Sequence, residues 1–367
     1  MLYHLLYPLK ENFIGFNLLS YITFRSAAAA ILALFITFLV GPKIIKWLKK
    51  KERGETIRND GPSTHLQKEG TPTMGGIIIL IAVLVPVLLF AKLNNVFIQL
   101  MIGGTLWMGL VGYIDDYLKV VRKYPQGLIG RYKLMGQVIW GLVVGLTITF
   151  ATEYTGVDGY GDVHWYISVP FFKNLMINLG IFYLPMVVFV ITATSNAVNL
   201  TDGLDGLAIG LMGIAALAWA GMSYVTGRTD FSSYLNVIYI KGAGELTIYC
   251  SALIGACLGF LWFNSHPADV FMGDTGALAL GGAMGTLAVV LKRELLLPLV
   301  AGVFVAETLS VMLQVGSYKW RGKRIFKMAP LHHHFELCGW AEEKVVTRFW
   351  ITGIILALLT LSTFKVR

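Results

Sequence analysis

The sequence predicts an all-α fold, a polytopic membrane protein with ten transmembrane helices. Apolar residues make up 56% of the 367 residues and charged residues only 14%, whereas about a quarter of a typical soluble domain is charged. The apolar residues gather in long runs, and Lys and Arg are concentrated in alternate loops between them. We expect one integral membrane domain over 1–367, because neither a tandem repeat nor a low-complexity linker divides the sequence.

The apolar runs are each close to the ~20 residues that a helix needs to cross a bilayer. Because lipid does not tolerate unpaired backbone groups, these runs should be helices. The predicted spans are 22–42, 74–91, 96–114, 134–151, 175–194, 206–225, 244–263, 275–291, 294–315 and 346–364. A small β-hairpin is expected in the loop at 152–173, where glycines precede alternating residues.

The positive charges predict the orientation, since Lys and Arg are enriched in cytoplasmic loops. The even-numbered loops contain 19 Lys and Arg, and the odd-numbered loops with both termini contain nine. We therefore expect the even loops in the cytoplasm and both termini outside. The net charge of +9 reflects this bias and is no evidence for nucleic-acid binding. Three cysteines without metal-ligand spacing predict neither a disulfide nor a zinc site.

The segment 196–206 is polar and acidic between two apolar runs. Asn196 begins it, and Asn199, Asp202 and Asp205 follow at threefold spacing, so on a helical turn they would share a face. Hard oxygen ligands of this kind suit Mg²⁺ together with substrate phosphates. The structural alternative is a helix N-cap, although polar groups at the membrane are costly to keep without a function.

Two adjacent carboxylates, Asp115 and Asp116, end the third span. At a membrane edge they suit a general base or a metal neighbour, and the alternative is a solvated helix end. Lys119 is within reach of either carboxylate on a helix. Lys133 belongs to the basic remainder of this loop, part of which we expect to contact phosphates.

A third helix end that bears a carboxylate is the start of the eighth span, which Asp274 opens between two glycines, where it could also be an N-cap. Just before it, Phe271 could stack on a planar ring or seal the interface. Gln314, at the end of the ninth span, is a weaker polar candidate. Glu307 lies inside that span, and we expect it to be buried and paired.

Two further segments carry candidate binding groups. Lys68 and Thr73 belong to a glycine-rich helix start, which with a nearby lysine is typical of an anion site. His332, His333 and His334 are consecutive, so they cannot all face one metal from a regular helix. Hydrogen bonds from these imidazoles to phosphates or to a carboxylate fit better than a zinc site.

All these clusters fall on one predicted membrane face. Together they indicate a Mg²⁺ and polyphosphate site, and a site at the edge of lipid suggests that one substrate is itself a lipid. The sequence contains no Walker motif, so a P-loop ATPase is excluded. Phosphoryl transfer depends on clamping and orienting oxygens, which these residue types can supply.

The chain closely resembles the phospho-N-acetylmuramoyl-pentapeptide transferases, a family of polyprenyl-phosphate N-acetylhexosamine-1-phosphate transferases. The resemblance covers nearly the whole chain, and no motif position departs from the family pattern. It is carried by Lys68-Glu-Gly-Thr-Pro-Thr-Met-Gly-Gly76, Asp115-Asp116, Asn196-Ala-Val-Asn-Leu-Thr-Asp-Gly-Leu-Asp-Gly206, Phe271-Met-Gly-Asp274 and Leu331-His-His-His-Phe-Glu336.

The resemblance implies a homodimer in the bacterial inner membrane, with periplasmic termini and hairpin and a cytoplasmic site. It implies transfer of phospho-MurNAc-pentapeptide from UDP-MurNAc-pentapeptide to undecaprenyl phosphate with Mg²⁺, giving lipid I and UMP. This is the first membrane step of peptidoglycan synthesis, on which cell wall, cell shape and cell division depend. Direct attack by the lipid phosphate and prior attack by an enzyme carboxylate both stay open.

The resemblance also assigns roles. Asp274 would hold Mg²⁺, with Asp115 and Asp116 as base or metal neighbours. The three histidines would contact phosphates. Asn199, Asp202 and Phe271 would contact the uridine part.

Two alternatives remain. A sister transferase would move GlcNAc-1-phosphate, and the run Leu331-His-His-His-Phe-Glu336 argues against it. An ion-coupled transporter would place its carboxylates near the bilayer midplane, whereas here they lie at predicted helix ends.

Overall fold

The computed structural model describes residues 1–11, 13–50, 70–124, 126–155, 157, 161–172 and 175–364. The long helices are α2 (Ile22–Lys50), α3 (Gly76–Phe90), α4 (Val96–Val120), α5 (Gly130–Phe150), α6 (Tyr183–Thr201), α7 (Leu207–Thr226), α9 (Leu246–Asn264), α10 (Gly273–Val290), α12 (Gly302–Arg321) and α14 (Glu342–Ser362). The short helices are α1 (Leu2–Leu6), α8 (Thr229–Leu235), α11 (Leu297–Val300) and α13 (Leu331–Leu337). The 3-10 turns are Tyr7–Glu11, Ile14–Ser20, Thr152–Tyr154, Gly180–Phe182 and Ala243–Glu245.

The prediction of a multi-span helical membrane protein is confirmed in its class. Within the described ranges, eight helices are long and apolar enough to cross a membrane, and α3 is a shorter apolar helix of 15 residues. The helix α12 has 20 residues but carries more polar groups and is not among the eight. The count of ten spans and the orientation of the termini stay predictions.

Two predicted boundaries differ from the structure. The fifth span was expected to start at 175, but α6 starts at Tyr183, because Met176–Asn178 (β2) pairs antiparallel with Tyr166–Ser168 (β1). The expected hairpin therefore exists, and its second strand uses residues assigned to the span. The ninth span was expected over 294–315, but the short α11 precedes α12. Apolar composition continues through both breaks, so hydropathy could not locate them.

The helix α10 is the centre of the bundle. Every residue from Thr275 to Val290 is buried, and α4, α6 and α3 pack against it. Two glycines permit this close packing. A Cβ on Gly112 of α4 would lie 2.1 Å from the carbonyl oxygen of Asp274, and a Cβ on Gly76 of α3 would lie 2.1 Å from the Gly276 nitrogen.

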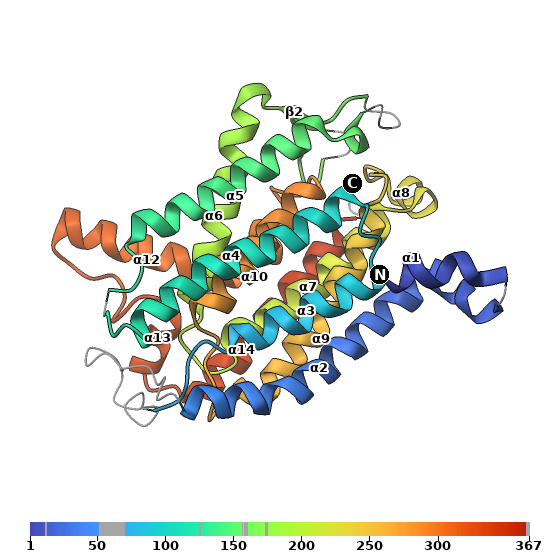
Figure 1. Ribbon diagram of the computed structural model, residues 1–367. Coiled ribbons are helices and arrows are strands. Elements are labelled where there is room, and N and C mark those ends of the chain that lie inside the picture. Colours follow the sequence, from blue (N-terminus) through green and yellow to red (C-terminus); the bar gives the residue numbers. More distant parts are fainter. Residues whose placement is uncertain are drawn as a thin grey trace.

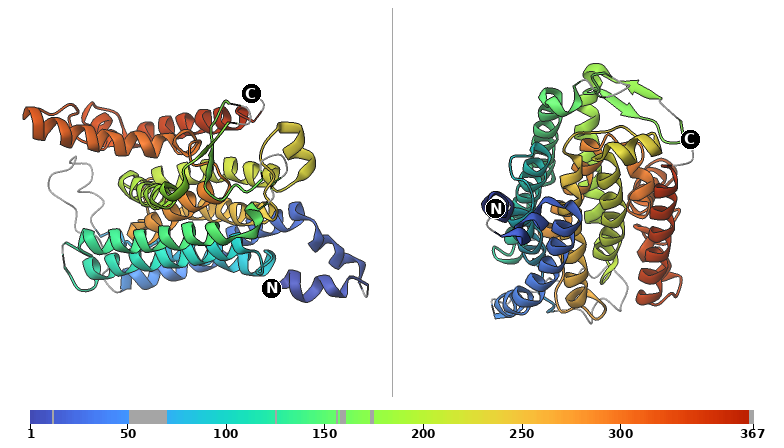
Figure 2. Two further views of the ribbon diagram at one scale, coloured as in Figure 1. Left: turned by 90° about the horizontal axis from the view of Figure 1, so that it is seen from above. Right: turned by 90° about the vertical axis from the view of Figure 1, so that its right-hand side faces the viewer.

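The remaining helices surround this centre (Figure 1). On one side α9 packs between α2, α3 and α7, and on the other side α5 packs on α6. The C-terminal helices α12 and α14 lie along one side of the bundle (Figure 2). Both chain ends lie at the same end of the bundle. The hairpin is bound to the C-terminal end of α10, so the acidic start of α10 lies at the opposite end.

Candidate active site

The three predicted carboxylates come together where α4 ends and α10 begins. Asp115 and Asp116 belong to the last turns of α4, and Asp274 is the second residue of α10. One oxygen from each carboxylate can be chosen so that the three lie within 4.8 Å of one another. Asp115 and Asp116 are buried, and the Asp274 side chain is 15% exposed. The close contact of Gly112 with the Asp274 backbone holds these two helix ends together.

Asp116 caps the start of α10. Its carboxylate accepts hydrogen bonds from the backbone nitrogens of Asp274 (3.1 Å) and Thr275 (2.9 Å) and from the Thr275 hydroxyl (2.6 Å). The first N–H groups of a helix lack partners within the helix, so a carboxylate from α4 satisfies them. The cap is therefore Asp116, and the alternative interpretation of Asp274 as the N-cap is wrong.

Two lysines lie among the carboxylates. Lys119 contacts Asp115 and is 3.1 Å from Asp274. Lys133, from the first turn of α5, is 3.0 Å from Asp115 and also donates to Asp274. Their side chains are 35% and 20% exposed. Asn199 completes the group, because its amide nitrogen donates to the other oxygen of Asp274 at 2.7 Å.

The residue types of this cluster fit a divalent cation, which prefers carboxylate oxygens. Asp274 and Asp115 are the better candidate ligands, since each has one oxygen, Oδ2, that contacts lysine ammonium groups, which a cation could replace. Asp116 has already accepted three hydrogen bonds from α10. Three carboxylates against two ammonium groups leave the cluster one formal negative charge, which favours a cation or a proton there.

The segment 70–76 lies beside the start of α10. Its backbone pairs with the segment before α10, through Phe271 N to Pro72 O (2.9 Å) and Gly75 N to Phe271 O (2.8 Å). Thr73 is thereby close to the acidic cluster, because a Cβ on Gly273 would be 2.9 Å from its hydroxyl. Lys68 lies outside the described residues, and its predicted phosphate contact stays a prediction.

The polar segment after α6 is only partly as expected. The helix α6 ends at Thr201, so Asp202 and Asp205 lie in the following turn and do not share a helix face with Asn199. Asn196 donates to Gln137 on α5 (2.9 Å) and to the Thr192 carbonyl (2.8 Å). The threefold spacing suggested one ligand set, but the break of the helix directs these side chains to different partners.

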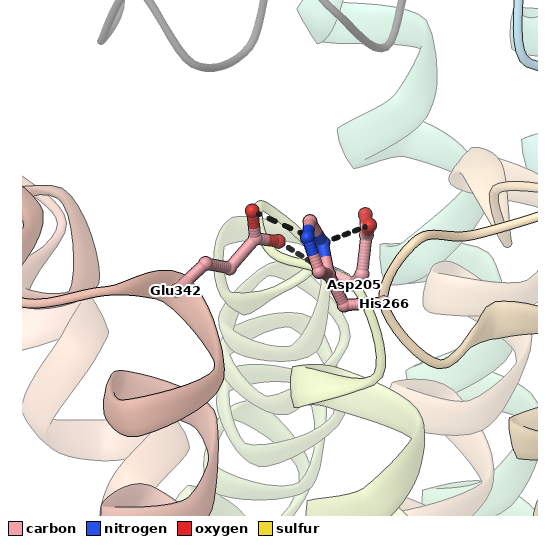
Figure 3. A group of neighbouring side chains, drawn as sticks. All are labelled: Asp205, His266 and Glu342. Atoms are coloured by element: carbon pink, nitrogen blue, oxygen red, sulfur yellow. Dashed lines mark hydrogen bonds and ion pairs between the residues drawn. The ribbon is translucent and has the colours of Figure 1, made fainter.

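Asp205 points into a separate cluster with His266 and Glu342 (Figure 3). His266 Nδ1 is 3.0 Å from Asp205 Oδ2 and 3.6 Å from Glu342 Oε2. Glu342 also accepts from the Asp205 backbone nitrogen (2.9 Å), and Asp205 Oδ2 accepts from the Ala268 nitrogen (3.2 Å). These three side chains could also hold a metal ion, and they join the α6–α7 loop and the α9–α10 loop to the start of α14. No sequence pattern predicts this cluster, because its residues lie far apart in the chain.

The three histidines have unequal surroundings in α13. His332 is fully buried and lies against Glu307 of α12. His333 is 2.9 Å from Glu336, and His334 accepts from the Lys327 backbone nitrogen at 3.2 Å. The prediction that Glu307 is buried and paired is confirmed, and its partner is His332.

Gln314 holds a loop of the backbone. Its side-chain oxygen accepts from the nitrogens of Ile325 and Phe326, each at 2.9 Å, and its amide donates to the Phe326 carbonyl at 2.8 Å. Both polar ends of this side chain are thus engaged within the chain, and its candidate role as a substrate contact stays a prediction.

The chain is similar in sequence to known proteins. A family model described as glycosyl transferase family 4 matches residues 98–292, and a signature of the phospho-N-acetylmuramoyl-pentapeptide transferases matches residues 68–80. The chain is 55% identical to the protein of that name from Thermodesulfovibrio yellowstonii and 52% identical to that from Citrifermentans bemidjiense. It is 50% identical to that from Desulfotalea psychrophila. Each alignment covers all of both chains.

Proposed function

Because the chain belongs to the phospho-N-acetylmuramoyl-pentapeptide transferases, enzymes of peptidoglycan synthesis, we propose its specific reaction. It moves phospho-MurNAc-pentapeptide from UDP-MurNAc-pentapeptide to undecaprenyl phosphate, with Mg²⁺, and gives lipid I and UMP. The observation that supports this most is the meeting of three carboxylates and two lysines at one end of membrane helices.

In this proposal each residue of the cluster has its own task. Asp274 and Asp115 would hold Mg²⁺, and the ion would supply charge neutralisation at the pyrophosphate oxygens. Lys119 and Lys133 then turn from the carboxylates to the phosphates, because both side chains are partly exposed. Asn199 orients Asp274 through its 2.7 Å hydrogen bond.

In the transfer step, an oxygen of the lipid phosphate forms a bond to the phosphorus that carries the sugar. The phosphoanhydride bond to UMP breaks, and UMP leaves with that electron pair. Direct attack is favoured over prior attack by Asp116, because that carboxylate is occupied by three hydrogen bonds from α10. We assign Thr73, Asn196, Asp202, Asp205, Phe271 and the buried His332 to the surroundings of the substrates, with Lys68, His333 and His334 as candidate phosphate contacts.

The alternatives are weaker. A GlcNAc-1-phosphate transferase would use the same phosphoryl chemistry, but the three full-length relatives described above carry the other name. An ion-coupled transporter would need its carboxylates near the middle of the membrane, whereas Asp115 and Asp274 lie at helix ends.

The deciding experiment measures UMP release by the purified protein in detergent. UDP-MurNAc-pentapeptide and undecaprenyl phosphate should together give UMP, and the rate should vanish with a chelator and return with Mg²⁺. UDP-GlcNAc in place of the first substrate is the matched control. Release from UDP-GlcNAc alone would support the sister activity and contradict the proposal.

We further propose that the protein is a homodimer in the bacterial inner membrane with the acidic cluster facing the cytoplasm. Residues 172 and 323 are both exposed, near the hairpin and near the histidine helix respectively. After replacement of Cys338, a cysteine at Phe172 should react with an impermeant thiol reagent in intact cells, and one at Lys323 should not. The opposite pattern would contradict this orientation.

A further inference from the structure

A buried pair between α12 and α13 is not used by the proposed chemistry. Glu307 is fully buried, as is His332. The backbone nitrogen of His332 donates to Glu307 Oε1 at 3.2 Å, and Glu307 Oε2 lies 3.3 Å from His332 Nδ1. A buried carboxylate inside a membrane helix is costly and calls for a named partner, and here that partner is the imidazole.

The opposite side of the imidazole contacts the turn between α6 and α7, which the proposed function assigns to the substrate. Both ring nitrogens of His332 and Glu307 Oε2 are buried without a hydrogen-bond partner among the described residues. Nε2 lies directly against Gly203, because a Cβ on that glycine would be 2.4 Å from it. Buried polar atoms without a hydrogen-bond partner are rare in folded proteins, so the retention of these atoms calls for an explanation.

Glu307 acts on the ring through its charge and on the backbone through a hydrogen bond. Glu307 Oε2 lies 3.3 Å from Nδ1 without hydrogen-bond geometry, and a negative charge this close favours a proton on Nδ1. The hydrogen bond to the His332 backbone ties α13 to α12. The ring is thereby placed with Nε2 against the turn formed by Asp202 and Gly203.

We propose that Glu307 is a positioning residue for the UDP-linked substrate. Acting through His332, it braces the Asp202–Gly203 turn, and thereby sets the end of α6 from which Asn199 reaches Asp274. This inference rests on the proposed function, which assigns that turn to the nucleotide. The pair does not touch the reacting phosphorus, so its effect belongs to nucleotide binding rather than to the transfer step.

Two variants disturb the brace from its two sides. Glu307→Gln keeps the size of the side chain, but its amide can donate to Nδ1 and favours the opposite tautomer. Gly203→Ala leaves Glu307 intact and places a methyl group 2.4 Å from Nε2, so the ring must shift. We expect each to raise the KM for UDP-MurNAc-pentapeptide about tenfold, about 1.4 kcal/mol, with kcat within about threefold and the KM for the lipid unchanged.

The double variant Glu307→Gln/Gly203→Ala tests whether both act through one ring. Its KM should be no worse than that of the poorer single variant, because residues that share a partner are not additive. Multiplied effects, an unchanged KM in either single variant, or a fall in kcat alone would overturn the proposal. Glu245→Gln is the matched control, since it removes a buried glutamate at the other end of the bundle and should leave the KM unchanged.

Calorimetric binding of UDP separates this inference from the proposed function. If the wild type neither binds UDP nor releases UMP, the proposed function fails. If the wild type binds UDP and both single variants bind it equally well, only the brace fails. The expected result is a dissociation constant raised about tenfold in both variants, with Gly203→Ala deciding the matter if Glu307→Gln does not fold.

Discussion

Charged side chains in largely buried positions lie at both ends of α10, and their roles differ. At the start, Asp274 shares Lys119 and Lys133 with Asp115, and both lysine side chains are partly exposed. Just beyond the other end, Lys292 and Glu294 have at most 4% of their surface exposed. The first set can exchange its partners for a ligand from solution, whereas the second set cannot.

The partners of Lys292 show what the buried charges at the far end do. Its ammonium donates to the His164 carbonyl (2.6 Å) and to the Tyr183 hydroxyl (2.8 Å). Ser168 of β1 donates to the Lys292 carbonyl at 2.6 Å. These bonds fasten the hairpin to the end of α10. The buried charges beyond the far end of α10 thus join segments of the fold, whereas those at its start stay accessible to a ligand.

The largest effect is expected from Asp274→Asn. Asp116, and not Asp274, caps α10, so the change leaves the cap intact and removes only the charge of a candidate metal ligand. The UMP release rate should fall by three to four orders of magnitude, about 4–5 kcal/mol, with an unchanged unfolding temperature. Excess Mg²⁺ should restore little. Asp269→Asn, at an exposed loop position, is the control and should stay active.

Glu245→Gln tests the end of the bundle opposite the acidic cluster. Glu245 holds the buried Arg25 through two hydrogen bonds of 2.7 Å, and loss of one partner from a buried ion pair costs about 3 kcal/mol or more. We expect a clearly lower unfolding temperature but near-normal UMP release from the folded fraction. A large activity loss without destabilisation would mean that the two ends are not functionally distinct.

Lys133→Gln should have an intermediate effect at the acidic end. If the ammonium group moves between Asp274 and a substrate phosphate, its loss should cost about 1.5–3 kcal/mol, the range for hydrogen bonds to charged groups. Steady-state UMP release should fall at least about tenfold. Arg131→Gln, two residues away and exposed, supplies the control for charge alone. Equal losses in both variants would mean that Lys133 acts only through its positive charge and makes no specific phosphate contact.

The smallest effect concerns pH and Lys292. Burial lowers the pKa of Lys292 from 10.5 to about 7. Between these values the unfolded chain binds the proton and the folded chain does not, so the free energy of unfolding should rise with pH, by at most about 1.4 kcal/mol per pH unit. Thermal unfolding at pH 7.5 and 8.5 measures this slope. Lys292→Met should remove it, and an unchanged slope would assign it to other groups.

The local features of the site could be predicted from the sequence, and the contacts between its segments could not. Apolar runs and adjacent carboxylates are visible in a few neighbouring residues, so the helical class and the pair Asp115–Asp116 were found. The cap that Asp116 provides for α10 joins residues 158 and 159 apart, and Asp205 meets His266 across 61 residues. No periodicity records such contacts.

The misplaced starts of α6 and α12 have a related cause. Residues 176–178 are apolar enough for a membrane span, but backbone pairing with β1 makes them a strand. Hydropathy reports how much a segment prefers lipid, and it does not report which backbone partner is available. The short α11 before α12 escaped prediction for the same reason, since the apolar run continues through it.

The contacts of Gly76 and Gly112 have a consequence for how this protein tolerates variation. Neither residue carries a functional group, yet any side chain at either position would strike the backbone of α10. A complete library of single substitutions should therefore show as little tolerance at these two glycines as at the carboxylates themselves. During evolution, the lipid-facing residues of the helices could then vary, while the packing of α3 and α4 against α10 would be conserved.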